Sequence, residues 1–188
     1  MGGSLILYVP TRLAIAANAA AQGNMSIVMV LTSLVLQHHG HSLTAIAWAH
    51  LFHSAGMFAF SIPIGKIADR IGRGKVMYPG LILTIAGAAL VGLTTGYISI
   101  TFGTFLVGIG WAMANVASTA LLADEVDTSM RGRAIGTADS WAGGTSLVLS
   151  IITGPLISYA GLPASAVFAA LVAAVPLAMW ALSRKKAD

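Results

Sequence analysis

The sequence predicts an all-α, polytopic membrane protein with six transmembrane helices, and its low charge is the first reason. Of the 188 residues, 57% are hydrophobic and only 9% are charged, whereas globular domains carry about 25% charged residues. Four stretches, 13–37, 42–65, 76–123 and 140–183, contain no Lys, Arg, Asp or Glu. Because a helix crosses a bilayer with about 20 apolar residues, the two longest stretches have room for a pair of crossings each.

Polar or helix-breaking residues separate the expected spans. The break QHHGHS contains Gly40, TTGY separates the third and fourth spans, and GLP at 161–163 places Pro163 where a helix can begin. The charged stretch DEVDTSMRGR separates the fourth span from the fifth. The six expected spans are about 12–36, 43–64, 76–95, 98–121, 135–158 and 164–183.

All ten basic residues fall on one side of the membrane if the chain has six spans. Because membrane proteins concentrate Lys and Arg in cytoplasmic loops, we expect both termini to be cytoplasmic. The net charge of +4 then reflects topology, and we expect no nucleic-acid partner. The bases are Arg12, Lys66, Arg70, Arg73, Lys75, Arg131, Arg133, Arg184, Lys185 and Lys186.

The absence of cysteine and of a signal-peptide pattern excludes some classes of site and of N-terminal segment. The chain has no cysteine, so it forms neither a disulfide nor a thiolate site. Residues 1–9 lack the pattern of a cleavable signal peptide, and we expect them to lead into the first span.

The loop between the second and third spans has an unusual density of charge. Residues 63–77, PIGKIADRIGRGKVM, contain four basic residues and one acid. They resemble the signature loop of the major facilitator superfamily, G-x-x-x-D-R-x-G-R with further basic residues, on the expected cytoplasmic side. Gly74 departs from the pattern, because the family often has a base there. The matching residues are Gly65, Asp69, Arg70, Gly72, Arg73 and Lys75.

The resemblance covers essentially all of residues 1–188. RGRAIG at 131–136 is similar to the basic loop before the fifth helix of a six-helix half, and GPLISYAG at 154–161 is loosely similar to the Gly-Pro motif of that helix. The HHGH loop followed by AGMFAFS resembles the region of the seventh and eighth helices in bacterial members. The chain is therefore similar to the carboxyl-terminal half of a twelve-span transporter, a single half-domain built as a 3+3 inverted repeat.

This resemblance implies transport of a small solute by alternating access, coupled to protons, in the bacterial inner membrane. It implies neither an enzyme nor a cofactor, and no metal is expected. The implied partners are the lipid bilayer, a small-molecule substrate and a second six-helix half, either an N-terminal half or a second copy. A partner is expected because the substrate site of such transporters lies between two halves, near the bilayer midplane.

The charges of the signature loop suggest a latch on the cytoplasmic face. Arg73 can reach an acid at the inner end of the fourth span, and Asp69 can sit against a helix N-terminus, where the dipole favours negative charge. The alternative is that these charges only set the topology around a tight turn. The expected latch partners are Asp124, Glu125, Asp127 and Arg131.

Two spans carry polar side chains at helical spacing. Asn18, Gln22 and Ser26 are four residues apart and therefore share one helical face. Trp111 and Asn115 show the same spacing in the fourth span. We expect these residues either to line a substrate cavity or to form hydrogen bonds between helices.

All five histidines fall between residues 38 and 53. His50 and His53 lie within the second span, where an ionisable group suggests contact with substrate or protons. His38, His39 and His41 form part of the outer loop. That loop either binds a metal or senses pH, since histidine does both, or is simply a polar loop.

Asp139 is the acid nearest the interior of a span, about one turn into the fifth helix. It is either a proton carrier or cation-binding group, or an N-terminal acid favoured by the helix dipole. Arg131 and Arg133 are near enough in sequence to pair with it.

The third and sixth spans are the expected lipid-facing ones. Thr84 is the only polar side chain in their middles, and polar groups inside a membrane usually face the bundle interior.

Two alternatives to a working transporter remain. A truncated, transport-inactive fragment would lack its second half. An intramembrane serine protease of rhomboid type needs a histidine after its serine, and no histidine follows His53.

Overall fold

The described part of the chain is helical, as the sequence predicts. The computed structural model of the protein describes residues 9–184, and in that range it contains helices and no strand. Residues 1–8 of the expected leader and the bases Lys185 and Lys186 lie outside the described residues. In chain order, the helices are α2 (Val9–His38), α3 (Leu43–Ala59), α4 (Ser61–Ile71), α5 (Arg73–Leu93) and α6 (Tyr97–Asp124), followed by the short 3₁₀ turn η1 (Thr128–Met130) and α7 (Arg131–Arg184).

The expected second span, 43–64, is broken and longer than the sequence suggests. The axis bends by 40° between α3 and α4, at Phe60. Helix α4 then continues to Ile71 and stops at Gly72, whose φ of +105° suits glycine. Most of the predicted signature loop is therefore helix, because no residue before Gly72 stops the helix.

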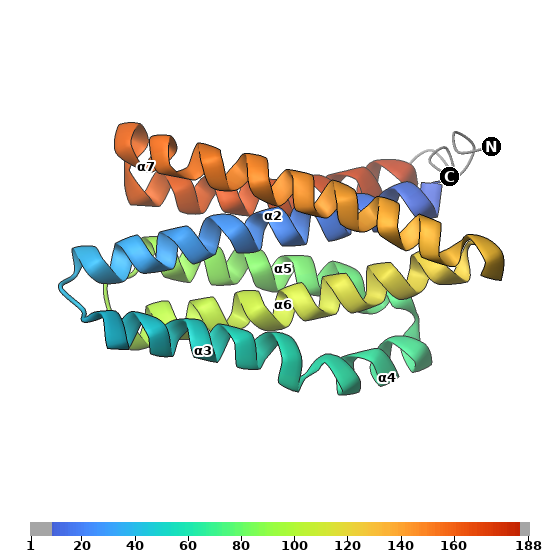
Figure 1. Cartoon of the computed structure of the whole chain (residues 1–188), viewed down its shortest axis with the longest axis horizontal. Helices are drawn as coiled ribbons and strands as arrows, with labels where there is room; N and C mark the ends of the chain where they lie inside the picture. The colour runs from blue at the N-terminus through green and yellow to red at the C-terminus, as the bar shows by residue number, and fades with distance from the viewer. Residues whose placement is uncertain (1–8, 185–188) are drawn as a thin grey trace.

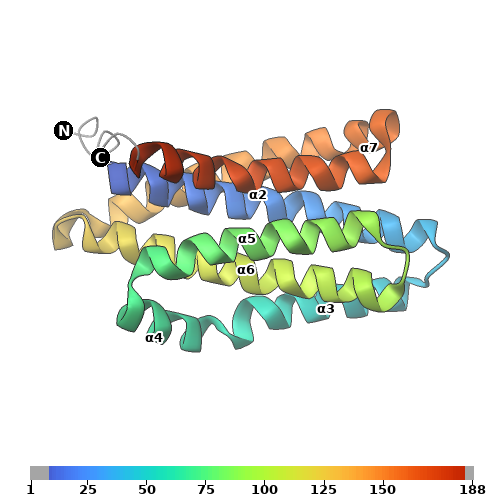
Figure 2. The same cartoon turned by 180° about the vertical axis from the view of Figure 1, so that it is seen from behind.

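Helix α7 contains both of the last two expected spans. Gly161 interrupts it with φ +82° and ψ 173°, and the chain reverses there (Figure 1). Residues 131–160 form its first segment and residues 162–184 its second, and the second segment packs beside α5 (Figure 2). A left-handed glycine directly before Leu162-Pro163 provides the turn that the motif GLP predicts.

Length and apolarity qualify several described helices as membrane spans. Four qualify as they stand, or five when α3 and α4 count as one span. Since α7 is counted once although it folds back on itself, the expected six spans each have a helical segment. The number of membrane crossings stays a prediction.

The basic segments of the described chain gather at one end of the bundle. Figure 1 shows at that end the start of α2, the junction of α4 with α5, the junction of α6 with α7 and the end of α7. The opposite end holds the turn at Gly40, the α5–α6 connection and Gly161. This arrangement is the one that six alternating spans require.

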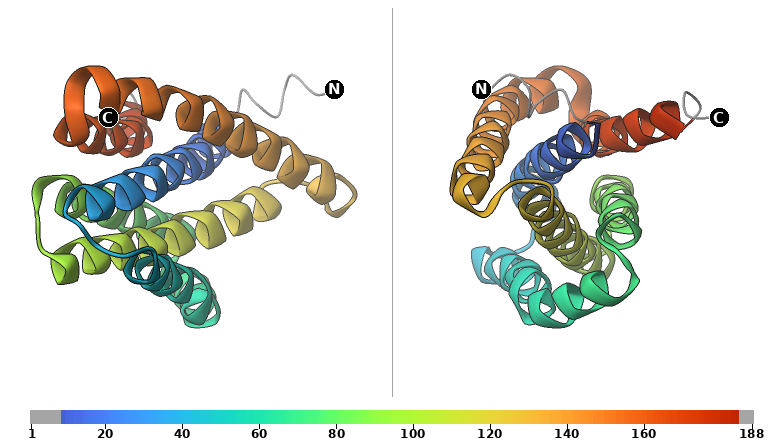
Figure 3. Two further views of the ribbon diagram at one scale, coloured as in Figure 1. Left: turned by 60° about the vertical axis from the view of Figure 1, so that its left-hand side comes forward. Right: turned by 90° about the vertical axis from the view of Figure 1, so that its right-hand side faces the viewer.

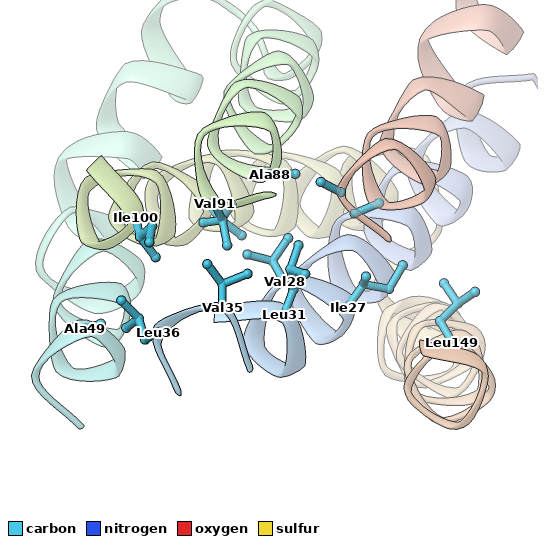
Figure 4. Close-up of a cluster of buried hydrophobic side chains, with 13 residues drawn as sticks. Ile27, Val28, Leu31, Val35, Leu36, Ala49, Ala88, Val91, Ile100 and Leu149 are labelled. Atoms are coloured by element: carbon cyan, nitrogen blue, oxygen red, sulfur yellow. The ribbon is translucent and has the colours of Figure 1, made fainter. Parts of the chain in front are cut away.

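Helix α2 lies at the centre of the bundle. It packs against α3, α5, α6 and α7, and the end-on views show it between α7 and α6 (Figure 3). Figure 4 shows its side chains Val28, Leu31 and Val35 directed toward the neighbouring helices, where all three are at most 2% exposed. The core cluster around α2 also includes Ile27, Leu36, Ala49, Ala88, Val91, Ile100, Val107, Leu149, Ala166 and Ala169.

Helices α5 and α6 approach each other through glycines. A methyl group added at Gly110 would lie 2.5 Å from the carbonyl oxygen of Gly80 and 2.9 Å from the nitrogen of Thr84. A methyl group at Gly87 would lie 2.5 Å from the carbonyl oxygen of Gly103. Glycine pairs of this kind let membrane helices pack backbone to backbone.

Large apolar side chains are exposed on more helices than the sequence predicts. The second segment of α7 exposes Leu171 and Val175, as expected of a lipid-facing span. However, α3 exposes Leu51 and the first segment of α7 exposes Ile151. Thr84 is buried and its hydroxyl donates to the carbonyl oxygen of Leu81 at 2.8 Å, so it adds no polarity to the outer face of α5.

Substituting alanine at Gly110 is expected to lower the free energy of unfolding by about 1–3 kcal/mol, because the added methyl group overpacks the α5–α6 contact. Titration of the detergent-solubilised chain with sodium dodecyl sulfate measures this. The matched control is Gly143→Ala, where an added methyl group meets nothing within 4 Å. Equal losses in the two variants would contradict the assigned contact.

Candidate functional site

Helix α2 directs its polar face at two other helices. Asn18, Gln22 and Ser26 are four residues apart, and each forms a hydrogen bond to α6 or α7. Hydrogen bonding between helices, one of the two roles expected for these residues, is therefore present. These bonds join the first, fourth and fifth expected spans.

Three of the predicted residues form one hydrogen-bonded chain. The amide nitrogen of Asn115 on α6 donates to Oδ1 of Asn18 at 2.9 Å. The Nδ2 of Asn18 faces Oδ1 of Asp139 on α7 at 3.4 Å, at the long end of the hydrogen-bond range. Asn18 is 2% exposed, whereas Asp139 is exposed. The chain thus runs from a buried amide to a carboxylate at the surface of the bundle.

Two further bonds continue this polar face along α2. The indole nitrogen of Trp111 donates to Oε1 of Gln22 at 2.7 Å, and both side chains are half-buried. One turn further, the hydroxyl groups of Ser26 and Ser146 bond to each other. Ser146 belongs to GGTSLV, and its role became visible only when the structure placed it beside α2.

Asp139 does not form the ion pair that its sequence neighbours suggest. Arg131 donates through Nε to the carbonyl oxygen of Ala123 at 2.9 Å. It thereby satisfies a backbone carbonyl near the end of α6, where such groups lack partners within the helix. Among residues 9–184, no salt bridge involves Asp139, and its recorded partner is the amide of Asn18.

The two histidines of α3 have different surroundings. His50 is half-buried, with Nδ1 2.9 Å from the carbonyl oxygen of Ile46 and Nε2 3.5 Å from the hydroxyl of Ser33 on α2. His53 is 3% exposed, and its Nδ1 lies 2.9 Å from the carbonyl oxygen of Thr104 on α6. His53 therefore bridges α3 and α6 inside the bundle, while His50 lies near the polar face of α2.

The loop histidines do not converge on a common point. The rings of His38 and His39 meet edge to face with centroids 5.4 Å apart, and His41 packs against Tyr97 instead. In the part of the chain that the structure describes, no group of three His, Asp or Glu side chains is placed to hold a metal ion.

Arg73 connects the signature loop to the end of α6. Its guanidinium bonds to Asp69, four residues earlier, and its Nε donates to Oδ2 of Asp124 at 3.1 Å. Asp69 therefore bonds to the side chain of Arg73 at the start of α5. It does not cap the N-terminus of α5, where no side chain forms a capping hydrogen bond. The contact with Asp124 is the one that a latch needs.

The other expected latch residues do not take part in this contact. Glu125 follows the last residue of α6, and Asp127 precedes η1. Within the described range, neither forms a salt bridge. Arg70 and Lys75 are exposed near the same junction, and Gly65 lies against Val116 at an ordinary distance of 3.8 Å for an added methyl group.

A comparison with protein families decides the class of this bundle. The pattern described as Major Facilitator Superfamily matches residues 13–188. The chain belongs to the major facilitator superfamily. This membership confirms the resemblance of the signature loop and identifies a multi-pass membrane protein of a transporter family, which counts against an intramembrane enzyme.

Individual relatives of this facilitator chain support the assignment. An uncharacterized MFS-type transporter of Bacillus subtilis, YdeG, is 30% identical over 167 residues, covering 85% of this chain and 38% of the relative. The riboflavin transporter RfnT of Brucella anthropi is 31% identical over 150 residues, covering 79% and 37%. The inner membrane transport protein YajR of Escherichia coli is 28% identical over 137 residues, covering 73% and 30%. The chain therefore spans under two fifths of the length of these relatives.

The structure brings together five of the seven residues that the sequence proposes for the cavity, and it separates two, His50 and His53. Asn18, Gln22, Trp111, Asn115 and Asp139 form the bonded face of α2, α6 and α7. His53 instead lies in the α3–α6 contact. Sequence reasoning missed the hydroxyl partners Ser33 and Ser146 and the backbone carbonyl of Thr104 that faces His53. No spacing within one helix marks a partner on another helix.

A double-mutant cycle on Arg73→Gln and Asp124→Asn is expected to give a coupling energy of about 0.2–1 kcal/mol, as for other exposed ion pairs. Unfolding in sodium dodecyl sulfate at low and high salt measures it. The coupling should fall in 1 M NaCl, where the Debye length is about 3 Å. The control cycle pairs Arg73→Gln with Glu125→Gln and should show no coupling. Equal coupling in both cycles would refute the specific contact.

Proposed function

We propose that this chain supplies half of the solute path of a secondary transporter that couples solute movement to protons. The observation that carries the proposal is the bonded chain from Asn115 through Asn18 to Asp139. Hydrocarbon offers no partners to such groups, so polar residues inside membrane proteins are costly and mark transport pathways. Family membership supports the same class of activity.

Asp139 is the proposed proton-carrying group. Its carboxylate is exposed beside the buried amide of Asn18, and no arginine or lysine of the described residues forms a salt bridge with it. Nδ2 of Asn18 can donate to the carboxylate and equally to the carbonyl oxygen of the carboxylic acid, while Oδ1 of Asn18 stays bonded to Asn115. The site can therefore hold Asp139 in either protonation state, which a proton carrier requires.

The neighbouring groups suit a flat, partly polar solute. Trp111 presents an indole ring beside the amide of Gln22, and both are partly exposed. An aromatic ring stacks on planar heteroaromatic molecules, and amides bond to their polar edges. Riboflavin, which the Brucella anthropi relative is named for transporting, is such a solute. A lipophilic cation, attracted by Asp139, is the second class to assay.

A second six-helix half is the proposed cover of this site. The polar face is open at Asp139, and the adjacent surfaces expose Leu51 on α3 and Ile151 on the first segment of α7. Facilitator sites lie between two halves, so the cover is either an N-terminal half or a second copy of this chain. A chain without such a cover would be transport-inactive, which is the alternative that the sequence leaves open.

The contact between Arg73 and Asp124 is the proposed latch of the cytoplasmic face. It ties the start of α5 to the end of α6, and both side chains remain partly exposed. An exposed ion pair of this kind is worth little in free energy. It can therefore break during each transport cycle without a large barrier.

Asp139→Asn, introduced at the chromosomal locus, is expected to abolish accumulation driven by a pH gradient and to leave downhill exchange of solute. The reason is that an amide cannot carry the proton but can keep its bond to Asn18. Membrane vesicles loaded with radiolabelled riboflavin, and in parallel with tetraphenylphosphonium, measure both activities.

The matched control for this test is Asp127→Asn, which removes a carboxylate outside the bonded chain. It should transport as the unsubstituted protein does. Undiminished accumulation in Asp139→Asn would remove this residue from the coupling mechanism.

Both termini are proposed to face the cytoplasm of a bacterial inner membrane, because the basic segments share one end of the bundle. The chain has no cysteine, so single cysteines can be labelled without background. A membrane-impermeant maleimide applied to intact cells should label Gln37→Cys, at the opposite end, and spare Lys66→Cys until the cells are opened. The reverse result would invert the orientation.

A further inference from the structure

A groove on the outer side of the bundle lies apart from the polar face of α2. It runs between the start of α5 and the end of α7 and has a volume of about 600 Å³. Its walls include Lys75, Tyr78 and Ile82 from α5 and Leu177, Trp180 and Arg184 from α7. The groove therefore combines an apolar floor with a base on each wall.

Aromatic rings support the bases at the mouth of this groove. The rings of Tyr78 and Trp180 are stacked with centroids 4.6 Å apart. The guanidinium carbon of Arg184 lies 4.6 Å from the centroid of Trp180, in cation–π contact. Tyrosine and tryptophan favour the level of lipid headgroups. The mouth thus has the chemistry of a membrane interface.

The described lining of the groove holds two bases and no acid to offset them. Among the described residues, neither Asp nor Glu lines the groove. Asp69 and Asp124, the acids of the latch, are both bonded to Arg73. Lys75 and Arg184 therefore present a net positive charge to any ligand in the mouth.

A second, apolar groove continues the first toward the middle of the bundle. It has a volume of about 240 Å³ and lies between the same two helical segments. Ile85 lies three residues beyond Ile82 on α5, and Ala174 lies three residues before Leu177 on α7, so the two grooves occupy successive helical turns. The apolar groove is lined by Ile85, Ala89, Leu93, Ala170, Leu171 and Ala174, among others of the same kind.

A third hollow lies on the other side of Trp180. Its volume is about 570 Å³, and Arg12 of α2 and Arg184 line it together with Leu13 and Met179. Trp180 and Arg184 thus belong to both hollows at this end of the bundle. Three bases, Lys75, Arg184 and Arg12, border the paired hollows.

We propose that the groove between α5 and the second segment of α7 binds an anionic phospholipid. The phosphate of phosphatidylglycerol lies between Lys75 and Arg184, and one acyl chain follows the apolar groove past Ile85 and Ala174. Basic pockets between membrane helices recognise anionic headgroups in this way. A cardiolipin would place its second phosphate in the hollow at Arg12.

The combination of features favours a lipid over other occupants. A free anion would use the bases but has no use for the apolar continuation. A packed helix of a partner would cover the apolar groove but would bury Lys75 and Arg184, which is costly unless that helix carries acids of its own to pair them. A phospholipid has an anionic head joined to a long apolar tail. The basic mouth of the groove matches the head, and its apolar continuation matches the tail.

The first experiment compares two lipids on the purified full chain. Native mass spectrometry in mild detergent measures binding of palmitoyl-oleoyl phosphatidylglycerol and of palmitoyl-oleoyl phosphatidylcholine, which share their acyl chains. A base near an anionic headgroup contributes about fivefold in affinity. We therefore expect a preference for phosphatidylglycerol of about 10- to 30-fold, and its loss in Lys75→Gln/Arg184→Gln. Equal binding of the two lipids would overturn the proposal.

The matched control is Lys66→Gln/Arg133→Gln. It removes the same charge, since Lys66 lies on α4 and Arg133 at the start of α7, but neither residue lines the groove, its apolar continuation or the hollow at Arg12. This variant should keep the preference for phosphatidylglycerol. An equal loss in both double variants would mean a general attraction between charges and would overturn the site.

A third variant separates a lipid from a free anion. Ala174→Phe fills the apolar groove while leaving both bases in place, so it should weaken phosphatidylglycerol binding about as much as the loss of the bases. Millimolar sn-glycerol 1-phosphate should not displace the lipid from the unsubstituted chain. Displacement by this headgroup analogue, or unchanged lipid binding in Ala174→Phe with a native circular dichroism spectrum, would overturn the lipid assignment.

Discussion

Hydrocarbon offers no hydrogen-bond partner to a peptide or an amide, and the rest of this structure depends on that constraint. A helix satisfies its own backbone, which accounts for the helical content of the described chain. Polar side chains must then find one another. Asn18 does so with Asn115 and Asp139, and Gln22 does so with Trp111. The same bonds that hold α2, α6 and α7 together thus create the polar face that we propose for the solute.

The hydrophobic effect does not drive helices together within lipid, so close packing has a larger role there. Helices α5 and α6 meet at Gly80, Gly87, Gly103 and Gly110, where no side chain separates the backbones. Other glycines, such as Gly143, meet nothing within the described chain. Glycine therefore has two uses in this bundle. One is internal contact, and the other is an open surface beside the proposed second half.

The basic residues of the described chain gather at one end of the bundle and serve several purposes there. Arg73 joins α5 to α6 through Asp124, and Arg131 satisfies a carbonyl at the end of α6. Arg184 rests on Trp180 and borders two hollows. The positive end that we propose to face the cytoplasm is thus also available for the proposed latch and the proposed anionic lipid. Each of these roles is carried by an arginine, and the partner of each arginine differs: a carboxylate, a backbone carbonyl or an indole ring.

The sequence by itself determined the all-α class and the family, because charge-free length and the D-R-x-G-R pattern are local properties. It also determined that Asn18, Gln22 and Ser26 share a face, since helical spacing is local as well. Only the tertiary structure decided that Asp139 meets Asn18 rather than Arg131, that His53 lies inside the α3–α6 contact, and that Ser146 faces Ser26. Contacts between helices depend on how each helix is rotated about its axis and tilted against its neighbours. The spacing of residues within a single helix does not specify that rotation or tilt.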